Sequence, residues 1–439
     1  MNPTAVPQFA ASVAAVRWFA GEHLFWDAPR WQALQSQELA AHLAHARTSP
    51  LYRDALHTID PATPLCDLPL TTKDQLASAG DSLYACDRTE VREWVCTSGT
   101  AGKPLHVPLT ASDLHRLAAN EAVALSIAGV RPGAAFLLAV GMDRLFVAGL
   151  AYWLGAQQLG AACIRIGPQQ ITQPDAIAEL LARTGPGHII AVPSFLGSID
   201  GLDRLRPQVN GIIAIGEPIR SPSLDYNPLG QRIAATFAAT VMSTYAATET
   251  CATFAEGPLC KGGHLNPQMA AVEILDDAGN SLPPGAIGEV VITPLGVQGL
   301  PLLRFRTGDL AALYTDPCPC GRTTPRLGPI VARKHQLLKI RGTSVYPQSI
   351  VDALRAFTEV ADYAIVAEQL DDLSDAVTIH LHLHSTGDTP ENRAAIDQRL
   401  RALLRVSPKL EFCTDQSLRR LHLTGGSRKP QHFIDRRVR

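Results

Sequence analysis

The segment between Cys96 and Pro104 combines the residue types that bind phosphate. It holds three hydroxyl side chains, two glycines and a lysine: Thr97, Ser98, Gly99, Thr100, Gly102 and Lys103. Glycine lets the backbone approach an anion, and hydroxyls, backbone N–H groups and an ammonium donate hydrogen bonds to phosphate oxygens. The spacing is not that of a Walker loop, because Pro104 follows the lysine where Ser or Thr would bind magnesium. The alternative interpretation is an ordinary polar turn.

This loop and four later segments resemble one enzyme family, in the family's order along the chain. The loop resembles the signature of the adenylate-forming superfamily, which contains acyl-CoA ligases and carrier-protein adenylation domains. The later matches are Gly-Glu-Pro at 216–218, Tyr-Ala-Ala-Thr-Glu at 245–249, Arg-Thr-Gly-Asp-Leu at 306–310 and Leu-Lys-Ile-Arg-Gly at 338–342. The stretch 141–155 and the tail 428–437 narrow the resemblance to the phenylacetate-CoA ligase branch, which has a compact C-terminal domain.

The resemblance implies a two-step ligation of a carboxylic acid, with an aryl acid suggested by the branch. The carboxylate would attack the α-phosphorus of ATP to give an acyl-adenylate and pyrophosphate. Coenzyme A would then take the acyl group and release AMP. Metal, lysine and backbone donors would neutralise the charge. Ser98, Thr100 and Lys103 would hold the β- and γ-phosphates, Thr248 would contact the α-phosphate, and Glu249 would bind Mg²⁺ through oxygen.

Further roles follow from the same resemblance. Gly216, Glu217 and Pro218 would contact the adenine, and Tyr245 belongs to the next nucleotide-binding segment. Asp309 would accept hydrogen bonds from the ribose hydroxyls. Arg333 matches the arginine at the hinge before the mobile domain. Lys429 would be the catalytic lysine that bridges the carboxylate and the α-phosphate. Taken singly, these residues also fit surface acids, helix caps and a solvated tail.

The acyl pocket is expected near residues 141–149, which resemble the aryl-pocket segment of this branch, and near Ala246 and Ala247. Phe146 would form a wall of the pocket, and Ala246 replaces a glycine that the family usually has. The hinge also differs from the family, because Ala-Arg-Lys-His-Gln at 332–336 stands where Gly-Arg-x-Asp-Asp is typical. The arginine is kept, whereas the hinge acids are missing.

A separate set of soft ligands predicts a structural zinc site. Cys318 and Cys320 form a Cys-x-Cys turn, and Cys260 and His264 lie in a glycine-containing turn. Three thiolates and one imidazole suit tetrahedral Zn²⁺. The alternatives are unrelated free cysteines, or Cys251 as a substitute ligand. A zinc hydrolase is disfavoured, because four protein ligands leave no open position.

Composition limits the class of protein. A chain of 439 residues with 46% hydrophobic and 18% charged residues is globular and long enough for two or more domains. The net charge of −2, without a basic cluster, argues against nucleic-acid binding. We see no signal peptide and no membrane span in the sequence, so we expect a cytoplasmic protein with reduced cysteines. Whether it forms a homodimer stays open.

The elements that would position these residues are predicted from hydrophobic periodicity. Apolar runs at 135–140, 188–192 and 211–215, separated by helical stretches, predict a mainly parallel α/β sheet. A β-rich subdomain is expected around 289–293 and after Asp309. The last hundred residues predict a small α+β unit, with helices at 347–357 and 391–404 and strands at 362–367, 377–384 and 410–413. We therefore expect domains at 1–333, with a helical lead-in at 1–90, and at 334–439.

Three alternative functions remain at this point. The chain could load a carrier protein, or it could form an amide with an amine. The altered hinge also allows a degenerate, non-catalytic nucleotide- or acyl-binding protein. The favoured hypothesis, an acid-CoA ligase, requires one site to perform two unlike reactions. It therefore predicts that the small domain moves about a hinge after Arg333.

Overall fold

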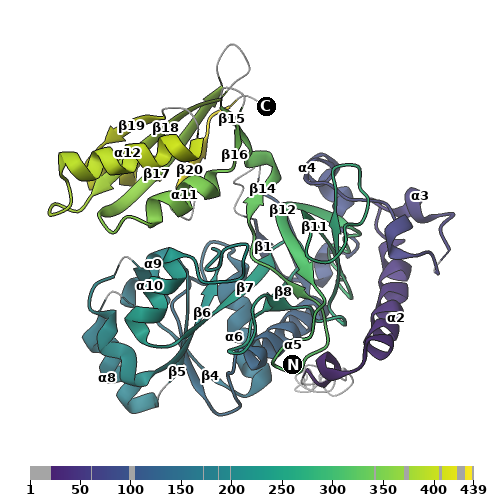
Figure 1. Ribbon diagram of the computed structural model, residues 1–439. Helices are drawn as coiled ribbons and strands as arrows, with labels where there is room; N and C mark the ends of the chain where they lie inside the picture. Colours follow the sequence, from purple (N-terminus) through teal and green to yellow (C-terminus); the bar gives the residue numbers. More distant parts are fainter. Residues whose placement is uncertain are drawn as a thin grey trace.

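The computed structural model describes residues 21–60, 62–97, 104–171, 173–185, 187–197, 199–340, 343–369, 375–404, 408–422 and 431–437. Six of the predicted site residues lie outside these ranges, namely Ser98, Gly99, Thr100, Gly102, Lys103 and Lys429. The described chain forms a large unit around a twelve-stranded sheet and a small unit around a four-stranded sheet. Figure 1 shows the small unit set apart from the large one, with β14 and β15 between them.

Five parallel strands form one half of the large sheet, in the order β7-β6-β5-β3-β4. Their bounds are β3 Ala135–Leu138, β4 Ala162–Arg165, β5 Gly187–Ala191, β6 Val209–Ile215 and β7 Thr240–Ala247. The three strands predicted from apolar runs are β3, β5 and β6. These runs are continuous rather than alternating because helices cover both faces of a parallel sheet.

Alternate residues of these strands pack against different helices. Leu137, Ile189 and Ile212 belong to the apolar cluster with α8 (Pro174–Thr184) and α10 (Pro228–Phe237). Their neighbours Phe136, Ile190 and Ile213 belong to the cluster with α5 (Ala111–Ile127) and α6 (Val147–Leu159). Two short helices, α7 (Gly167–Gln170) and α9 (Pro193–Gly197), complete the crossovers. The period of two along each strand thus makes a three-layer arrangement.

The sheet continues through antiparallel strands, so the expected β-rich subdomain is part of the same sheet. After β7 come β8 (Ala252–Ala255), β9 (Gly263–His264), β13 (Arg326–Leu327), β12 (Phe305–Tyr314), β11 (Ile287–Pro294) and β10 (Ala270–Leu275). A short strand, β14 (Ala332–Arg333), pairs with β12 and ends the large unit. The predicted α/β class with a β-rich part is confirmed.

The described part of the lead-in is helical and packs beside the antiparallel half. It contains α2 (Ala28–Ala46), α3 (Arg53–Leu56) and α4 (Lys73–Ala79). Asp27 caps α2 by accepting a hydrogen bond from the Arg30 amide, and Thr72 and Gln75 form a capping box on α4. An antiparallel hairpin follows, made of β1 (Val91–Cys96) and β2 (His106–Thr110). Its connection carries the predicted phosphate loop.

The small unit follows the predicted order and adds two elements at its end. A hairpin of β15 (Leu338–Ile340) and β16 (Thr343–Val345) leads to the sheet β19-β18-β17-β20. The predicted elements are α11 (Pro347–Arg355), β17 (Val360–Gln369), β18 (Asp375–Leu383), α12 (Pro390–Leu404) and β19 (Lys409–Phe412). The additional ones are α13 (Asp415–His422) and β20 (Phe433–Asp435). Among the described residues, no helix is long and apolar enough to cross a membrane.

One buried arginine joins α5 to the antiparallel half of the large unit. Arg116 is 2% exposed, and its guanidinium donates to the carbonyl oxygens of Leu295, Cys251 and Met269. These three carbonyls belong to connections that are far apart in sequence. Because a buried carbonyl without a donor is costly, this one side chain holds three segments against the helix.

We therefore predict that Arg116→Met strongly destabilises the large unit. Each carbonyl left without a donor costs about 1–3 kcal/mol, so the loss should reach several kcal/mol. Arg131→Met is the matched control, because Arg131 is exposed and donates locally, to the Ser126 carbonyl. Urea unfolding followed by circular dichroism would measure both variants. Equal midpoints for the two would contradict the role given to Arg116.

Candidate active site

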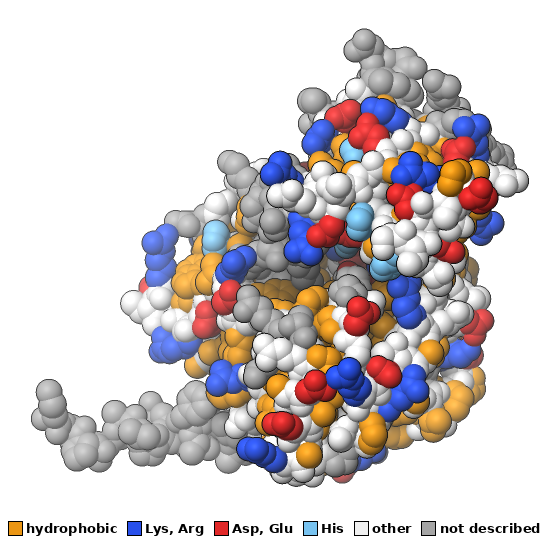
Figure 2. All heavy atoms as spheres, turned by 90° about the vertical axis from the view of Figure 1, so that its left-hand side faces the viewer, with side chains coloured by type: hydrophobic (Ala, Val, Ile, Leu, Met, Phe, Trp, Pro, Cys, Tyr) orange, Lys and Arg blue, Asp and Glu red, His pale blue; other side chains and the backbone are white. Residues whose placement is uncertain are grey.

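A cleft of about 2060 Å³ lies between the two units and receives residues from both. On the large unit it covers the carboxyl ends of β3, β5, β6 and β7, so its lining includes Gly141, Ser194, Gly216 and Thr248. The chain order of the strands reverses between β3 and β5, and such a switch point is where open α/β sheets bind ligands. Figure 2 shows the hollow between the units, with hydrophobic side chains inside it.

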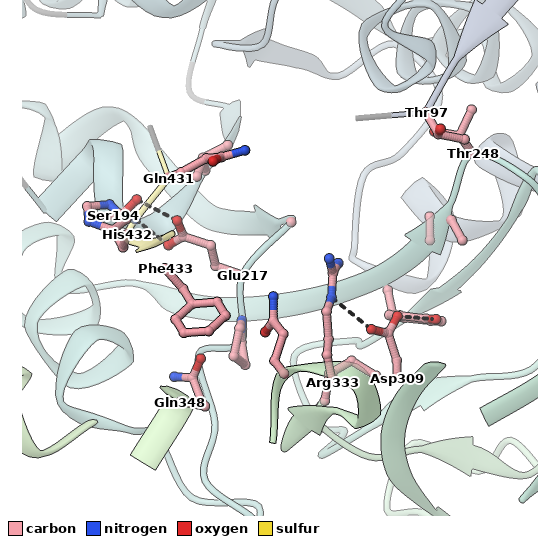
Figure 3. Close-up of a pocket in the computed structure, with 18 of the residues that line it drawn as sticks. Thr97, Ser194, Glu217, Thr248, Asp309, Arg333, Gln348, Gln431, His432 and Phe433 are labelled. Atoms are coloured by element: carbon pink, nitrogen blue, oxygen red, sulfur yellow. Dashed lines mark hydrogen bonds and ion pairs between the residues drawn. The ribbon is translucent and has the colours of Figure 1, made fainter. Parts of the chain in front are cut away.

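A carboxylate is fixed on the antiparallel side of the cleft. Asp309 on β12 accepts a hydrogen bond of 2.9 Å from the Tyr245 hydroxyl and forms an ion pair of 3.0 Å with Arg333. Strand register creates this pair, since Asp309 lies opposite Arg333 in the β12–β14 ladder. Burial and the Asp309 charge raise the pKa of Tyr245 well above its usual value, so the phenol stays a donor. The hydrogen bond from Tyr245 and the ion pair with Arg333 fix the Asp309 carboxylate at the cleft wall (Figure 3).

A second carboxylate lies at the end of β6 and contacts both units. Gly216 has a φ of +76°, which turns the chain sharply after the strand. The next residue, Glu217, accepts hydrogen bonds from the Ser194 hydroxyl at 2.6 Å and from the Ser194 amide at 3.0 Å. Arg355 of α11 lies 3.6 Å from the same carboxylate. Figure 3 shows Glu217 and Ser194 together, with His432 and Phe433 of the small unit beside them.

Sequence reasoning missed Ser194 and Arg355. Ser194 follows β5 in the same way that Glu217 follows β6, so its position after a buried strand was an available signal. Nothing in the local sequence marks Arg355, which reaches the cleft only because α11 packs against the large unit. The predicted residue Pro218 lines the cleft next to Glu217.

The turn after β7 presents the predicted phosphate and magnesium residues. Thr248 and Glu249 lie in the tight connection between β7 and β8, are partly exposed, and line the cleft. Thr97, the described end of the phosphate loop, lines the same cleft and receives a hydrogen bond of 3.0 Å from the Leu105 amide. In Figure 3 both threonines lie away from Glu217. The cleft therefore has hydroxyls at one end and Glu217 at the other.

The predicted acyl residues line the cleft on the parallel side. Phe146 precedes α6, and Ala246 and Ala247 end β7. A Cβ added to Gly149 would lie 2.3 Å from the Gly141 carbonyl oxygen, so this helix must carry glycine where the loop approaches it. The loop also contains Arg144 with a φ of +55°, a conformation that side chains rarely adopt.

The four predicted zinc ligands come together away from this cleft. Their ligand atoms all lie within 4.8 Å of one another, and they are Cys260, His264, Cys318 and Cys320. Strand β9 pairs with both β8 and β13, which brings the two loops to one place. Nε2 of His264 is 3.2 Å from the Cys320 sulfur, while Nδ1 donates to the Thr324 carbonyl at 3.1 Å. A carbonyl on the far nitrogen is how a ligating histidine is usually oriented.

The protonation of this cluster suits metal binding. Burial lowers the pKa of His264 to about 4, so its imidazole is neutral. Burial raises the pKa of Cys260 and Cys318. Burial also opposes a thiolate at Cys320, but hydrogen bonds from Arg322 and Cys318 bring its pKa below the usual value. Three crowded thiols would lose their protons fully only to a cation.

The substitute ligand Cys251 does not join this cluster. Its thiol donates to the Thr248 carbonyl at 3.2 Å, and it packs in the core beside α5 and α6. Burial raises the pKa of Cys251 to about 12, so it remains a thiol. The geometry therefore favours the set of Cys260, His264, Cys318 and Cys320 without Cys251.

Comparison with known proteins agrees with this architecture. Residues 37–297 match the family model of AMP-binding enzymes, and residues 342–437 match that of the AMP-binding enzyme C-terminal domain. The chain is 30% identical over 377 residues to phenylacetate-coenzyme A ligase of Thermus thermophilus, covering 79% of this chain and 80% of the relative. It is also 30% identical over 410 residues to the Escherichia coli enzyme of that name, covering 88% and 90%.

A solved 2-hydroxyisobutyryl-CoA ligase in complex with 2-HIB-AMP shares the fold. It has a TM-score of 0.77 and 22% identity, and the match covers 93% of this chain and 90% of that one. The family model spans more than half of the chain, and the Escherichia coli relative spans most of it. The chain therefore belongs to the family of AMP-binding enzymes, and its predicted class, an ATP-dependent acid-CoA ligase that works through an acyl-adenylate, is confirmed.

Proposed function

We propose that this ligase activates an aryl carboxylic acid with ATP and Mg²⁺ and transfers the acyl group to coenzyme A. The observation that carries the assignment is the convergence of the predicted segments on one cleft. Glu217 follows β6, Thr248 follows β7 and Asp309 lies on β12, and all three line the cleft. The relatives named phenylacetate-coenzyme A ligase favour an aryl acid. Phe146 at the parallel side of the cleft offers a flat apolar wall for such a ring.

The cleft residues favour one orientation of ATP, with the adenine near Glu217 and the α-phosphate near Thr248. Asp309 would bind the ribose hydroxyls, because its carboxylate is paired with Arg333 and lines the cleft. Glu217 would lie at the adenine end, and Thr248 at the α-phosphate. Glu249 would supply an oxygen ligand to Mg²⁺, which prefers such ligands and keeps several waters. Ser98, Thr100 and Lys103 would donate to the terminal phosphates.

The first half-reaction needs a cation at the α-phosphate. The acid's carboxylate and the phosphate are both negative, so their approach is unfavourable until positive charge lies between them. Lys429 is the proposed cation. It belongs to the small unit, so adenylation would require that unit to close over the cleft. The second half-reaction would require the same space for the thiol of coenzyme A.

The contacts around residue 335 favour a pivot there. Lys334 is held by the large unit through ion pairs with Asp277 at 2.7 Å and Glu289 at 3.3 Å. On the other side, Arg437 of the small unit donates to the Leu337 carbonyl at 2.8 Å. Rotation is therefore easiest between Lys334 and Leu337, one residue beyond the boundary predicted from the sequence. A few residues in such a connection can absorb a large backbone change.

We expect Lys429→Ala to abolish adenylation while leaving the fold intact. ATP–pyrophosphate exchange with phenylacetate should fall at least a hundredfold, because positioned charge stabilisation contributes that much. Lys409→Ala is the control, since Lys409 is an exposed lysine of the same unit paired with Glu411. Exchange by the Lys429 variant within tenfold of wild type would refute the role.

The acceptor is tested by incubating the wild-type enzyme, the acid and ATP with coenzyme A, with amines or with a carrier protein, and identifying which acyl product forms.

A structural zinc ion at Cys260, His264, Cys318 and Cys320 predicts about one zinc per chain in protein purified without chelators. Chelation should lower the melting temperature, because metal-binding energy is folding energy at such sites. Cys318→Ser should lose the metal, whereas Cys66→Ser should keep it, since Cys66 is exposed and outside the cluster. Elemental analysis that finds no zinc, or the same zinc in both variants, would reject the site.

A proline at the pivot should separate the two half-reactions. Gln336→Pro fixes one φ and restricts His335, so we expect one half-reaction to fall at least tenfold more than the other. Gln336→Ala removes the same side chain without stiffening the backbone and serves as the control. Single-turnover adenylation and thiol transfer from preformed acyl-adenylate would be measured separately. Equal losses in both, with the fold intact, would favour a static site.

A further inference from the structure

Three metal-ligating side chains gather on the cleft face of the small unit, apart from the cysteine cluster. Asp362 lies on β17, His422 is the last residue of α13, and His432 directly precedes β20. Their ligand atoms lie within 4.8 Å of one another, and all three line the cleft. Figure 2 shows histidine side chains on the small unit near the hollow, and Figure 3 shows His432 facing the Ser194–Glu217 pair.

The hydrogen bonds of the two imidazoles leave one nitrogen of each available as a ligand. Nε2 of His422 and Nδ1 of His432 each lie 3.0 Å from the Tyr363 carbonyl oxygen. A carbonyl only accepts, so each imidazole must donate its N–H there. In a neutral ring the other nitrogen then carries the lone pair. An imidazole oriented by a backbone carbonyl in this way is typical of a metal ligand.

The distances suit a small divalent cation. Nδ1 of His422, the nitrogen with the lone pair, lies 3.5 Å from one oxygen of Asp362. Two ligands bonded at roughly 2.1 Å to a tetrahedral ion are roughly 3.4 Å apart. The ring of His432 lies against the other oxygen, 3.7 Å from its Nδ1. That Nδ1 also donates to the Tyr363 carbonyl, so His432 would bind the same ion through Nε2 only after its ring turns and gives up this hydrogen bond.

A hydrogen-bonded network without metal is the competing explanation. In it, a protonated His422 would bridge Asp362 and the Tyr363 carbonyl. The two histidines of β18 show what such pairing looks like, since His380 pairs with Glu411 at 3.2 Å and His382 bonds the Cys413 carbonyl. Those rings point to separate partners, whereas His422 and His432 share a carbonyl and a carboxylate. Convergence on one point favours the metal.

We propose that Asp362, His422 and His432 bind a divalent transition-metal ion of the zinc class. Two imidazoles and one carboxylate suit Zn²⁺ or Co²⁺, and three protein ligands leave a coordination position open. Both histidines border residues 423–431, so the ion would fix the two ends of the segment that contains Lys429. This last consequence rests on the proposed role of Lys429, whereas the metal site itself does not.

Cobalt titration of the full-length protein tests the site. We expect two equivalents of Co²⁺ to bind after chelation and dialysis, one with the thiolate-to-metal absorption of the cysteine cluster and one without it. Asp362→Asn and His432→Gln should each lose only the equivalent without thiolate absorption. Cys318→Ser should lose only the other. His384→Gln is the control, because His384 lines the cleft outside the cluster.

Absence of an equivalent without thiolate absorption, or such an equivalent that survives both Asp362→Asn and His432→Gln, would overturn the proposal. Circular dichroism would establish that each variant is folded. Loss of the second equivalent should slow single-turnover adenylation at least threefold and leave thiol transfer from preformed adenylate unchanged. Lys429→Ala separates the two ideas: it should still bind both equivalents. If it keeps adenylation activity, the role of Lys429 fails while the metal site stands.

Discussion

Hydrogen bonding along one continuous sheet places segments that are far apart in sequence at a common edge. Parallel strands β3, β5, β6 and β7 must all end on the same side, and their connections therefore meet there. The antiparallel strands extend the same sheet, and β12 among them brings Asp309 to the cleft. The cleft is thus a consequence of strand direction. Its chemistry depends on which residue follows each strand.

The same ladder couples nucleotide contacts to the position of the small unit. Arg333 is both the partner of Asp309 and the last strand residue before the connection to β15. Glu217 is bonded to Ser194 of the large unit and contacts Arg355 of the small one. Both carboxylates proposed to bind the nucleotide therefore contact residues that would respond to domain movement. A nucleotide that competes for either carboxylate would bias the orientation of the small unit, as linkage requires.

Much of this arrangement could be predicted from the sequence because its signals are local. Apolar runs predicted β3, β5 and β6. Residues such as Asp309 and Thr248 were assigned to the site because each belongs to a short motif that resembles the family's. The cluster of Cys260, His264, Cys318 and Cys320 was predicted from residue type, since Cys and His in tight turns have few other uses. The additional elements α13 and β20 are short and lack a long apolar pattern, which explains why they were missed.

Contacts made by packing could not be predicted in this way. Arg355 meets Glu217 only when α11 lies against the large unit, and no feature of 347–357 indicates that. The histidines show the same limit. The converging pair is His422, the last residue of α13, and His432, which lies ten residues further on and directly precedes β20. Sequence spacing predicts which residues share a face of one helix or strand. It does not predict which residues of two different elements are in contact.

The changed hinge alters which contacts a movement must break. The family resemblance leads one to expect acids after Arg333, whereas this chain has Lys334, which pairs with Glu289 and Asp277 of the large unit. A lysine anchored there can stay in place while the residues after it rotate. Among the described residues, the polar contacts that such a rotation would break include Arg437 with the His335 carbonyl and Arg355 with Glu217. Partly exposed ion pairs and single hydrogen bonds contribute little each. The missing acids are therefore compatible with movement, because the anchor has shifted to the large unit and the contacts that must break are weak ones.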